Sequence, residues 1–164
     1  MHRKSSFFVS TAVFGLLIQV AVADAATVVA LGASNTAGAG VSPSQAYPAQ
    51  LEAMLHVRGL DVSIINAGIS GDTTEHMMSR LGTAVPRNTK IVILQPGGND
   101  MRRGARTYTS EIRKQLRAMG IRVVMVPNSM FRGKPHQADG IHLTAEGYHM
   151  LAQQLVRPVV NALR

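Results

Sequence analysis

The feature that most constrains the fold is an alternation of short apolar runs, rich in β-branched residues, with segments of helical period. Four runs are predicted as strands, at 27–31, 62–65, 90–95 and 122–126. Helical patterns lie between and after them, at 47–59, about 73–81, 110–120 and from 144 onward. Alternating strands and helices pair in parallel through right-handed crossovers. The sequence therefore predicts an α/β fold, a three-layer α/β/α sandwich.

The first 23 residues have the pattern of a secretory signal peptide. Arg3 and Lys4 form a basic head, and an apolar stretch ending in small residues follows. Cleavage after residue 25 is one alternative, and an uncleaved N-terminal anchor is another. We expect a signal peptide over 1–23, a single domain over 24–164, and a periplasmic or secreted protein.

Composition narrows the partners and the chemistry. The chain has no cysteine, which excludes thiolate catalysis and cysteine metal sites. Without residues 1–23, which hold two basic and no acidic residues, the net charge falls from +8 to +6. That charge favours contact with lipid surfaces, but the basic residues are scattered and aromatics are few, so nucleic-acid binding is not expected. His56, His76 and His149 lack ligand-like partners at suitable spacing, and no metal site is predicted.

Small and polar residues directly follow the first three predicted strands. Ser34 comes after the first strand, Gly68 after the second and Asn99 after the third. The pair Asp139 and His142 follows the fourth strand after a loop. In a parallel sheet these strand ends meet at one edge, where ligands bind. Acyl transfer needs a hydroxyl nucleophile, a base and donors that face the developing oxyanion. The set therefore predicts a hydrolytic site at this edge.

Each of these residues has a role in such a site. The Asp139 carboxylate, three residues before His142, can accept the Nδ1–H of the imidazole and leave Nε2 free as a base. Ser34 would be the nucleophile. Its own N–H, the Gly68 N–H and the Asn99 amide would bind the oxyanion. The alternative for the Asp-x-x-His segment is a loop that only caps the following helix.

These blocks resemble the SGNH (GDSL-type) hydrolase family, which is named for Ser, Gly, Asn and His in four sequence blocks. The segments "NAGISGDTT" and "GGND" are particularly similar to its thioesterase, lysophospholipase and arylesterase branch. The resemblance implies a flavodoxin-like parallel sheet, shortened here to about four strands. It implies a triad of Ser34, Asp139 and His142, with Ser34, Gly68 and Asn99 as the oxyanion hole. The implied activity is hydrolysis of small carboxylic esters or thioesters, such as lipid, aryl or acyl esters, through an acyl-enzyme and without a cofactor.

The chain departs from the family pattern in two places. Ala33 stands where the Gly-Asp-Ser-Leu block has an aspartate, and this removes a carboxylate that would help to hold the nucleophile turn. The family also has a further helix and a fifth strand before the Asp-x-x-His segment, where this chain has only residues 127–138. Fully extended, that segment spans roughly 40 Å, enough to reach Ser34. The fourth strand should then be a sheet edge, which we expect to pair with a second subunit, giving a homodimer, or to be covered by residues 128–137.

Three further alternatives stay open on the sequence alone. Ser70 is a rival nucleophile, although a turn serine that caps the next helix is the favoured interpretation. Arg102, Arg103 and Arg106 could meet an anionic substrate group or form a solvated face. The domain itself could be a catalytically degenerate binding module, or a basic protein that adheres to anionic membranes.

Overall fold

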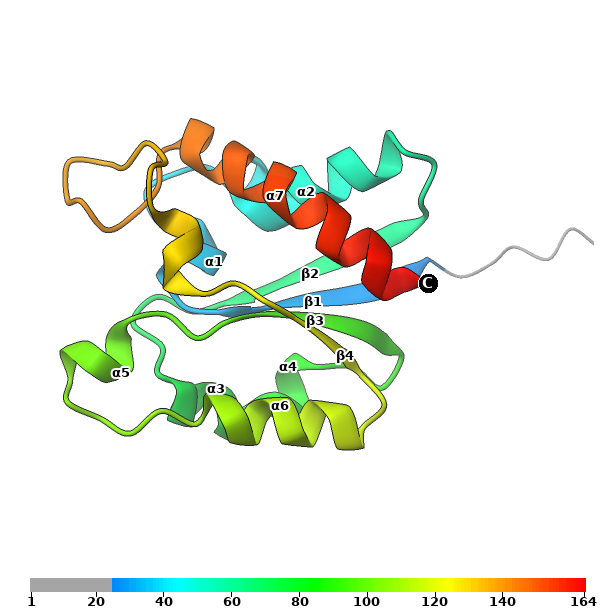
Figure 1. Ribbon diagram of the computed structural model, residues 1–164, viewed down its shortest axis with the longest axis horizontal. Coiled ribbons are helices and arrows are strands. Elements are labelled where there is room, and N and C mark those ends of the chain that lie inside the picture. Colours follow the sequence, from blue (N-terminus) through cyan, green and yellow to red (C-terminus); the bar gives the residue numbers. More distant parts are fainter. Residues whose placement is uncertain (1–24) are drawn as a thin grey trace, which may run out of the picture.

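The computed structural model describes residues 25–164, so the predicted signal peptide at 1–23 lies outside the described residues. Four parallel strands form one sheet in the order β2-β1-β3-β4 (Figure 1). The strands are β1 (Ala26–Gly32), β2 (Val62–Gly68), β3 (Thr89–Gln95) and β4 (Arg122–Met125). This order matches the first four strands of a flavodoxin-like sheet. The predicted fold class and the shortened sheet are confirmed.

Helices cover both faces of the sheet, which gives three layers (Figure 1). One layer holds α1 (Ser34–Ala37), α2 (Tyr47–His56) and α7 (Ala145–Leu163). The other layer holds α3 (Thr74–Ser79), α4 (Leu81–Ala84), α5 (Asn99–Arg102) and α6 (Thr109–Ala118). The single helix expected over about 73–81 is two short helices, because the chain leaves helical geometry at Arg80. Two 3₁₀ turns complete the elements, η1 (Pro43–Gln45) and η2 (Asn128–Phe131).

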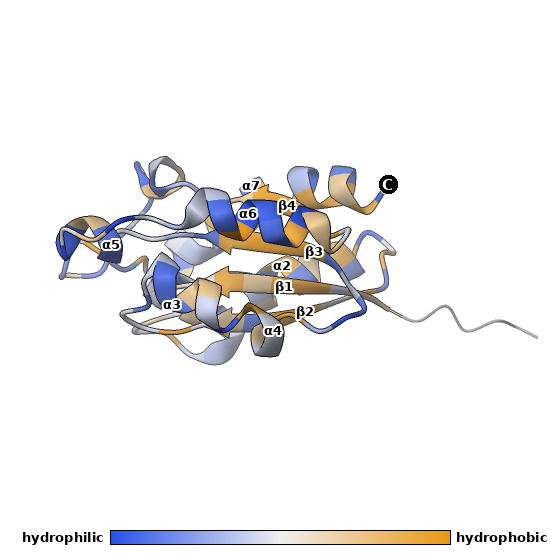
Figure 2. Ribbon diagram, turned by 90° about the horizontal axis from the view of Figure 1, so that it is seen from below, coloured by the Kyte–Doolittle hydropathy of each residue, from blue (hydrophilic) through white to orange (hydrophobic). Residues whose placement is uncertain are grey.

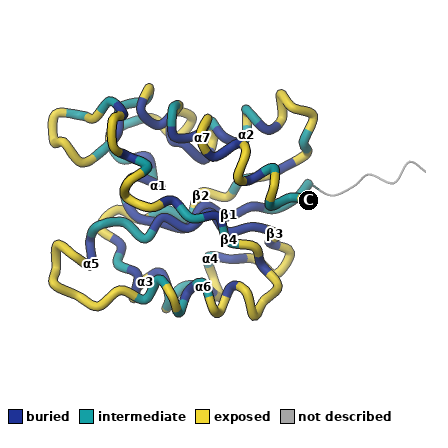
Figure 3. Tube along the Cα trace, in the orientation of Figure 1, coloured by how far each residue is buried: buried dark blue, intermediate teal, exposed yellow. Residues whose placement is uncertain are grey.

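The central strand β1 sends alternate side chains into two cores. Val28 and Ala30 pack with α2 and α7, and Val29 and Leu31 pack with α3, α4 and α6. All four side chains are fully buried, and β1 and β3 form the apolar, buried middle of the sheet (Figures 2 and 3). Burying one such Val or Leu side chain stabilises the fold by about 1.5–3 kcal/mol. The two cores make the sheet a rigid base for the loops at its carboxyl edge.

The strand order reverses between β1 and β3, so the segments that follow these two strands lead to helices on opposite faces of the sheet. β1 is followed by α1, while β3 is followed by α5, and the last residues of the two strands, Gly32 and Gln95, are paired in register. A crevice at such a reversal is where open α/β sheets bind ligands. Ser34 and Asn99 therefore start from neighbouring strand ends.

β4 is an edge strand, as expected. Residues 128–137 do not pair with it: within residues 25–164 no backbone hydrogen bond joins this loop to β4. The loop runs instead along α7, where the buried Lys134 Nζ donates to Met130 O and to Gln154 Oε1 at 2.8 Å. Burial lowers the pKa of Lys134. Within residues 25–164 the loop therefore does not pair with the edge through its backbone, and pairing with a second subunit stays a prediction.

Within residues 25–164, every helix is too short or too polar to cross a bilayer.

Candidate active site

Ser34 is the first residue of α1, in a tight turn directly after β1. The turn is held by the buried Gln95 at the end of β3, whose Oε1 accepts hydrogen bonds from Ala33 N at 3.0 Å and Thr36 Oγ1 at 2.9 Å. Gln95 thus supplies an acceptor to the turn in which Ala33 has no carboxylate. As the first helical residue, Ser34 has an N–H without a partner inside the helix. Among the described residues no other acceptor takes it.

Asp139 holds the ring of His142. Its Oδ2 accepts the Nδ1–H of His142 at 2.5 Å, and its Oδ1 accepts the backbone N–H groups of Ile141 at 2.8 Å and His142 at 3.0 Å. Hydrogen bonds from the His142 backbone, the Ile141 backbone and the His142 ring, in that order, lower the pKa of Asp139 to about 2. The following helix is capped by Thr144, whose Oγ1 accepts the Gly147 N–H. The helix cap is therefore not the function of Asp139.

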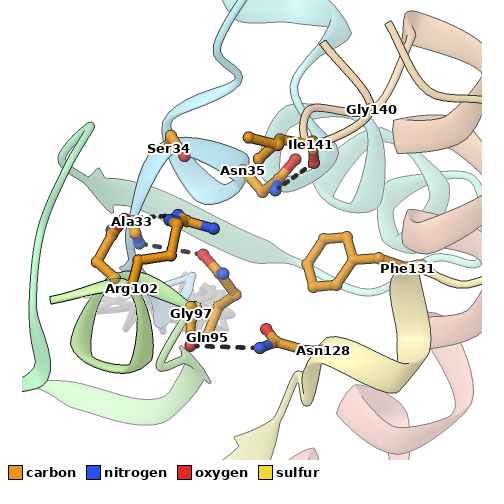
Figure 4. Close-up of a pocket in the computed structure, with 12 residues that line it drawn as sticks. Ala33, Ser34, Asn35, Gln95, Gly97, Arg102, Asn128, Phe131, Gly140 and Ile141 are labelled. Atoms are coloured by element: carbon orange, nitrogen blue, oxygen red, sulfur yellow. Dashed lines mark hydrogen bonds between the residues drawn. The ribbon is translucent and has the colours of Figure 1, made fainter. Parts of the chain in front are cut away.

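Asn35 joins the turn of Ser34 to the segment of His142. Its Nδ2 donates to Ile141 O at 3.2 Å, and its Oδ1 accepts the Leu143 N–H at 3.3 Å (Figure 4 shows the Ile141 bond). The Tyr148 hydroxyl donates to the same Oδ1 at 3.0 Å. Burial raises the pKa of Tyr148 to about 12, so this hydroxyl keeps its proton at ordinary pH. Sequence reasoning missed Asn35, although its position beside Ser34 was a signal.

Gln137 forms a second link between the same two regions. Its Nε2 donates to Ala39 O and to Leu143 O, both at 2.8 Å, and its backbone N–H donates to His142 O at 2.8 Å. Gly40 lies so close that a Cβ there would be 2.1 Å from Gln137 Oε1. The segment carrying His142 is therefore fixed against the residues that follow α1, despite the short loop before it.

Asn99 starts α5 and is nearly buried. Its Nδ2 donates one hydrogen to Asp72 O at 2.7 Å, and its Oδ1 accepts a hydrogen bond from Arg102 Nη2 at 2.7 Å. These two contacts fix which side of the amide is the donor. The second Nδ2 hydrogen is left for another acceptor.

Gly68 is not placed as predicted. Its N–H donates to Asn66 Oδ1 at 3.0 Å, so it is not free for an oxyanion. A Cβ at Gly68 would lie 2.2 Å from Ala37 N, which shows that the glycine is needed for close packing of α1 on β2. Gly71, with φ +79°, lines a cavity with Ser34, and no hydrogen bond among the described residues uses its N–H. The order of glycines in the sequence gave no way to prefer Gly71.

Two adjoining cavities lie at this edge of the sheet, of about 220 Å³ and about 230 Å³. They share four wall residues: Ser34, Asn99, Arg102 and Ile141. The first cavity extends toward Phe131 and Asn128, which come from the loop after β4 (Figure 4). The second contains His142. Ser34 therefore borders both cavities.

The structure brings Ser34, Asn99 and His142 to one cavity, and Asp139 lies behind His142. No hydrogen bond joins Ser34 Oγ to the His142 ring in residues 25–164. Catalytic hydrogen bonds of this kind often tighten only when substrate is bound. The His142 side chain is 23 % exposed and lines the second cavity.

The rival residues are placed as follows. Ser70 lines the second cavity. Ser70 was expected to cap α3, but the capping residue is Thr73, whose Oγ1 accepts the His76 N–H. Arg106 pairs with Glu111 on the surface. Within the described part of the chain, no group of three or more His, Asp or Glu side chains could hold a metal ion.

A sequence model of the GDSL-like Lipase/Acylhydrolase family matches residues 30–138, more than half of the chain. The chain belongs to this family. The match contains Ser34 and Asn99 and ends one residue before Asp139. The predicted family is therefore confirmed, and the roles of individual residues rest on the geometry above.

Relatives of this GDSL-like protein carry esterase names. Esterase TesA of Pseudomonas aeruginosa is 32% identical over 117 residues, 68% of this chain and 57% of that protein. The crystal structure of AlinE4, described as an SGNH-hydrolase family esterase, is 25% identical with a TM-score of 0.60, covering 87% of this chain and 98% of that one. The psychrotrophic esterase EstA from Pseudoalteromonas sp. has a TM-score of 0.74 at 18% identity, covering 84% and 98%, which shows a shared fold. The chain spans about half the length of the curated relatives it matches.

Proposed function

We propose that this protein hydrolyses small carboxylic esters or thioesters through an acyl-enzyme on Ser34. The observation that carries the proposal is the cavity that Ser34 shares with Gly71, Asn99 and His142. Asp139, ionised and bonded to His142 Nδ1, holds the neutral imidazole in the tautomer that carries its proton on Nδ1, so that Nε2 is the base. The esterase names of the relatives support the same class of reaction.

The chemistry proceeds in two halves. His142 Nε2 takes the hydroxyl proton of Ser34 while Oγ bonds to the substrate carbonyl carbon. The proton passes to the leaving oxygen or sulfur, the alcohol or thiol departs, and the acyl group stays on Ser34. Water then attacks the acyl-enzyme, His142 takes a proton from the water and returns it to Ser34 Oγ, and the carboxylic acid is released.

Three donors would bind the oxyanion of each tetrahedral intermediate. They are the Ser34 N–H, the Gly71 N–H and the second Nδ2 hydrogen of Asn99. Gly71 takes the role expected for Gly68, because the Gly68 N–H already donates to Asn66. Losing one such donor typically costs about 2.7–4 kcal/mol of transition-state stabilisation.

Labelling with a fluorophosphonate tests the proposal directly. We expect a single adduct, on Ser34, that is absent in Ser34→Ala and much slower in His142→Ala. Ser70→Ala is the matched control, because Ser70 lines the same cavity, and it should label at the wild-type rate. A folded protein that does not label, or that labels on Ser70, rules out Ser34 as the nucleophile.

A second candidate function is ligand binding by a degenerate site. It is favoured by one observation, that Ser34 Oγ is not hydrogen-bonded to His142 in residues 25–164. In that case the fluorophosphonate leaves the protein unmodified. A non-hydrolysable ester analogue still binds in the cavity and protects the backbone amides of the cavity residues from hydrogen exchange.

Location and assembly belong to the same proposal. The pattern over 1–23 supports export to the periplasm or beyond, where lipid or carbohydrate esters would be substrates and the positive charge would favour lipid surfaces. The unpaired edge of β4 supports a homodimer. Strictly monomeric protein with fast amide exchange along 123–126 contradicts the dimer.

A further inference from the structure

Arg102 is the one charged side chain that lines both cavities in the described part of the chain. It extends from α5 toward Ser34 and Asn35 (Figure 4). Its Nη2 donates to Asn99 Oδ1 at 2.7 Å, so the guanidinium lies beside the amide that would bind the oxyanion. The neighbouring Arg103 donates to Gly71 O at 3.1 Å. Arg103 lines neither cavity, so Arg102 is the arginine that faces the reacting centre.

The carboxylates near these arginines are engaged elsewhere. Asp72 is buried and bonded to Arg80 and His76. Asp100 is buried and accepts three hydrogen bonds from Thr74. Asp139 holds His142. No carboxylate of residues 25–164 lines either cavity, and none forms an ion pair with Arg102.

Arg102 therefore has donors left for a ligand. One Nη2 hydrogen bonds to Asn99, and a guanidinium carries five hydrogens in a fork that matches a carboxylate. Because Arg102 is fixed next to Asn99, an anion that meets it would lie within a few bonds of the carbonyl under attack. That short separation fits a small carboxylate on the substrate itself.

Resting on the function proposed above, we infer that the preferred substrates are esters that carry a carboxylate within about four bonds of the scissile carbonyl, recognised by Arg102. The carboxylate can belong to the acyl part, as in half-esters of dicarboxylic acids. It can also belong to the alcohol part, as in esters of hydroxy acids. In both cases the Arg102 guanidinium binds the carboxylate.

Matched ester pairs test the inference. Monoethyl succinate is compared with ethyl succinamate for the acyl side, and O-butyryl glycolate with O-butyryl glycolamide for the alcohol side, with hydrolysis followed by base uptake. We expect kcat/KM to favour the carboxylate about tenfold in one arm, which identifies the side. The preference should weaken in high salt.

Variants separate Arg102 from general effects. Arg102→Gln should bring the ratio of kcat/KM for the carboxylate ester to kcat/KM for the amide ester close to one. This holds even if both esters are hydrolysed more slowly because the contact with Asn99 is lost. Arg102→Lys should keep part of the preference. Arg58→Gln, in the turn after α2 with a bond to Met54 O, is the matched control and should keep the wild-type ratio. A wild-type ratio near one in both arms, or a ratio that survives Arg102→Gln, overturns the inference.

Failure of the catalytic proposal gives a different result. If neither ester of any pair is hydrolysed and Ser34 is not labelled, the esterase function fails. Binding of the same pairs to Ser34→Ala, measured by calorimetry, then still decides the question of Arg102. If Ser34→Ala binds the carboxylate and the amide equally, the inference is overturned. If it binds the carboxylate more tightly, and the double variant Ser34→Ala/Arg102→Gln does not, the inference is upheld.

Discussion

Asn35 Nδ2 donates to Ile141 O at 3.2 Å, across 106 positions of sequence. The bond joins the residue after Ser34 to the residue before His142. The buried Asn35 also accepts the Leu143 N–H, so both neighbours of His142 are held from one side chain. Together with Gln137, Asn35 therefore fixes where His142 lies relative to Ser34, whatever the length of the loop after β4.

Replacing Asn35 by Leu should slow the chemistry more than it weakens substrate binding. We expect kcat to fall at least about tenfold with KM little changed, because a displaced base slows proton transfer. Steady-state kinetics and the rate of fluorophosphonate labelling measure the effect. Tyr148→Phe, which removes only the hydroxyl bond to Asn35, should cost less. Equal losses in the two variants would show that Asn35 acts only through stability.

Asp139→Asn should lower kcat by about 10²-fold or more, because the amide can stabilise the wrong tautomer of His142 and cannot compensate the charge of its imidazolium. The fold should persist, since the Asp139 side chain is 43 % exposed. Circular dichroism provides the check on folding. Unchanged kcat in a folded variant would remove Asp139 from the triad.

The low pKa of Asp139 also predicts a pH dependence. The folded carboxyl titrates at about 2, below its usual 3.8, so its contribution to stability is complete above about pH 4 and is lost as pH falls through about 2. The difference in denaturation midpoint between wild type and Asp139→Asn should therefore shrink as pH falls from about 4 toward 2. An acid limb of activity near pH 5 or above belongs to a group other than Asp139.

Gln95→Leu should destabilise the protein by about 1–3 kcal/mol, because it leaves the buried Ala33 N–H and Thr36 hydroxyl without their acceptor. Urea denaturation measures the loss. Gln115→Leu, an exposed position on α6, is the matched control and should change stability by less than about 0.5 kcal/mol. A similar cost at both positions would mean that the turn does not depend on Gln95.

Much of the fold could be predicted because its signals are local. The β-branched runs at 27–31 and 90–95 identify buried strands, and the alternation with helices implies parallel order. Ser34 and Asn99 could be placed at one edge because each directly follows a strand. The split of the helix at Arg80 depends on tertiary contacts, since Arg80 bonds to Asp72 and to Ala67 O.

The site was harder to predict where it depends on contacts between distant residues. Gln95 and Asn35 act on partners 62 and more than 100 positions away, and nothing in their local sequence indicates those partners. Gly68 and Gly71 lie in one short segment, and only the path of the backbone shows that the first packs against α1 while the second lines the cavity.

The tethering of His142 by Asn35 and Gln137 makes the loop before it a tolerant place for added sequence. Foreign residues grafted between the exposed Arg132 and Gly133 would lengthen the route from β4 without breaking either tether of His142, since neither tether includes residues 132 or 133. Such a graft would follow closely on Phe131, which lines the first cavity. This family member could thus accept a new substrate lid while keeping its reacting groups in register.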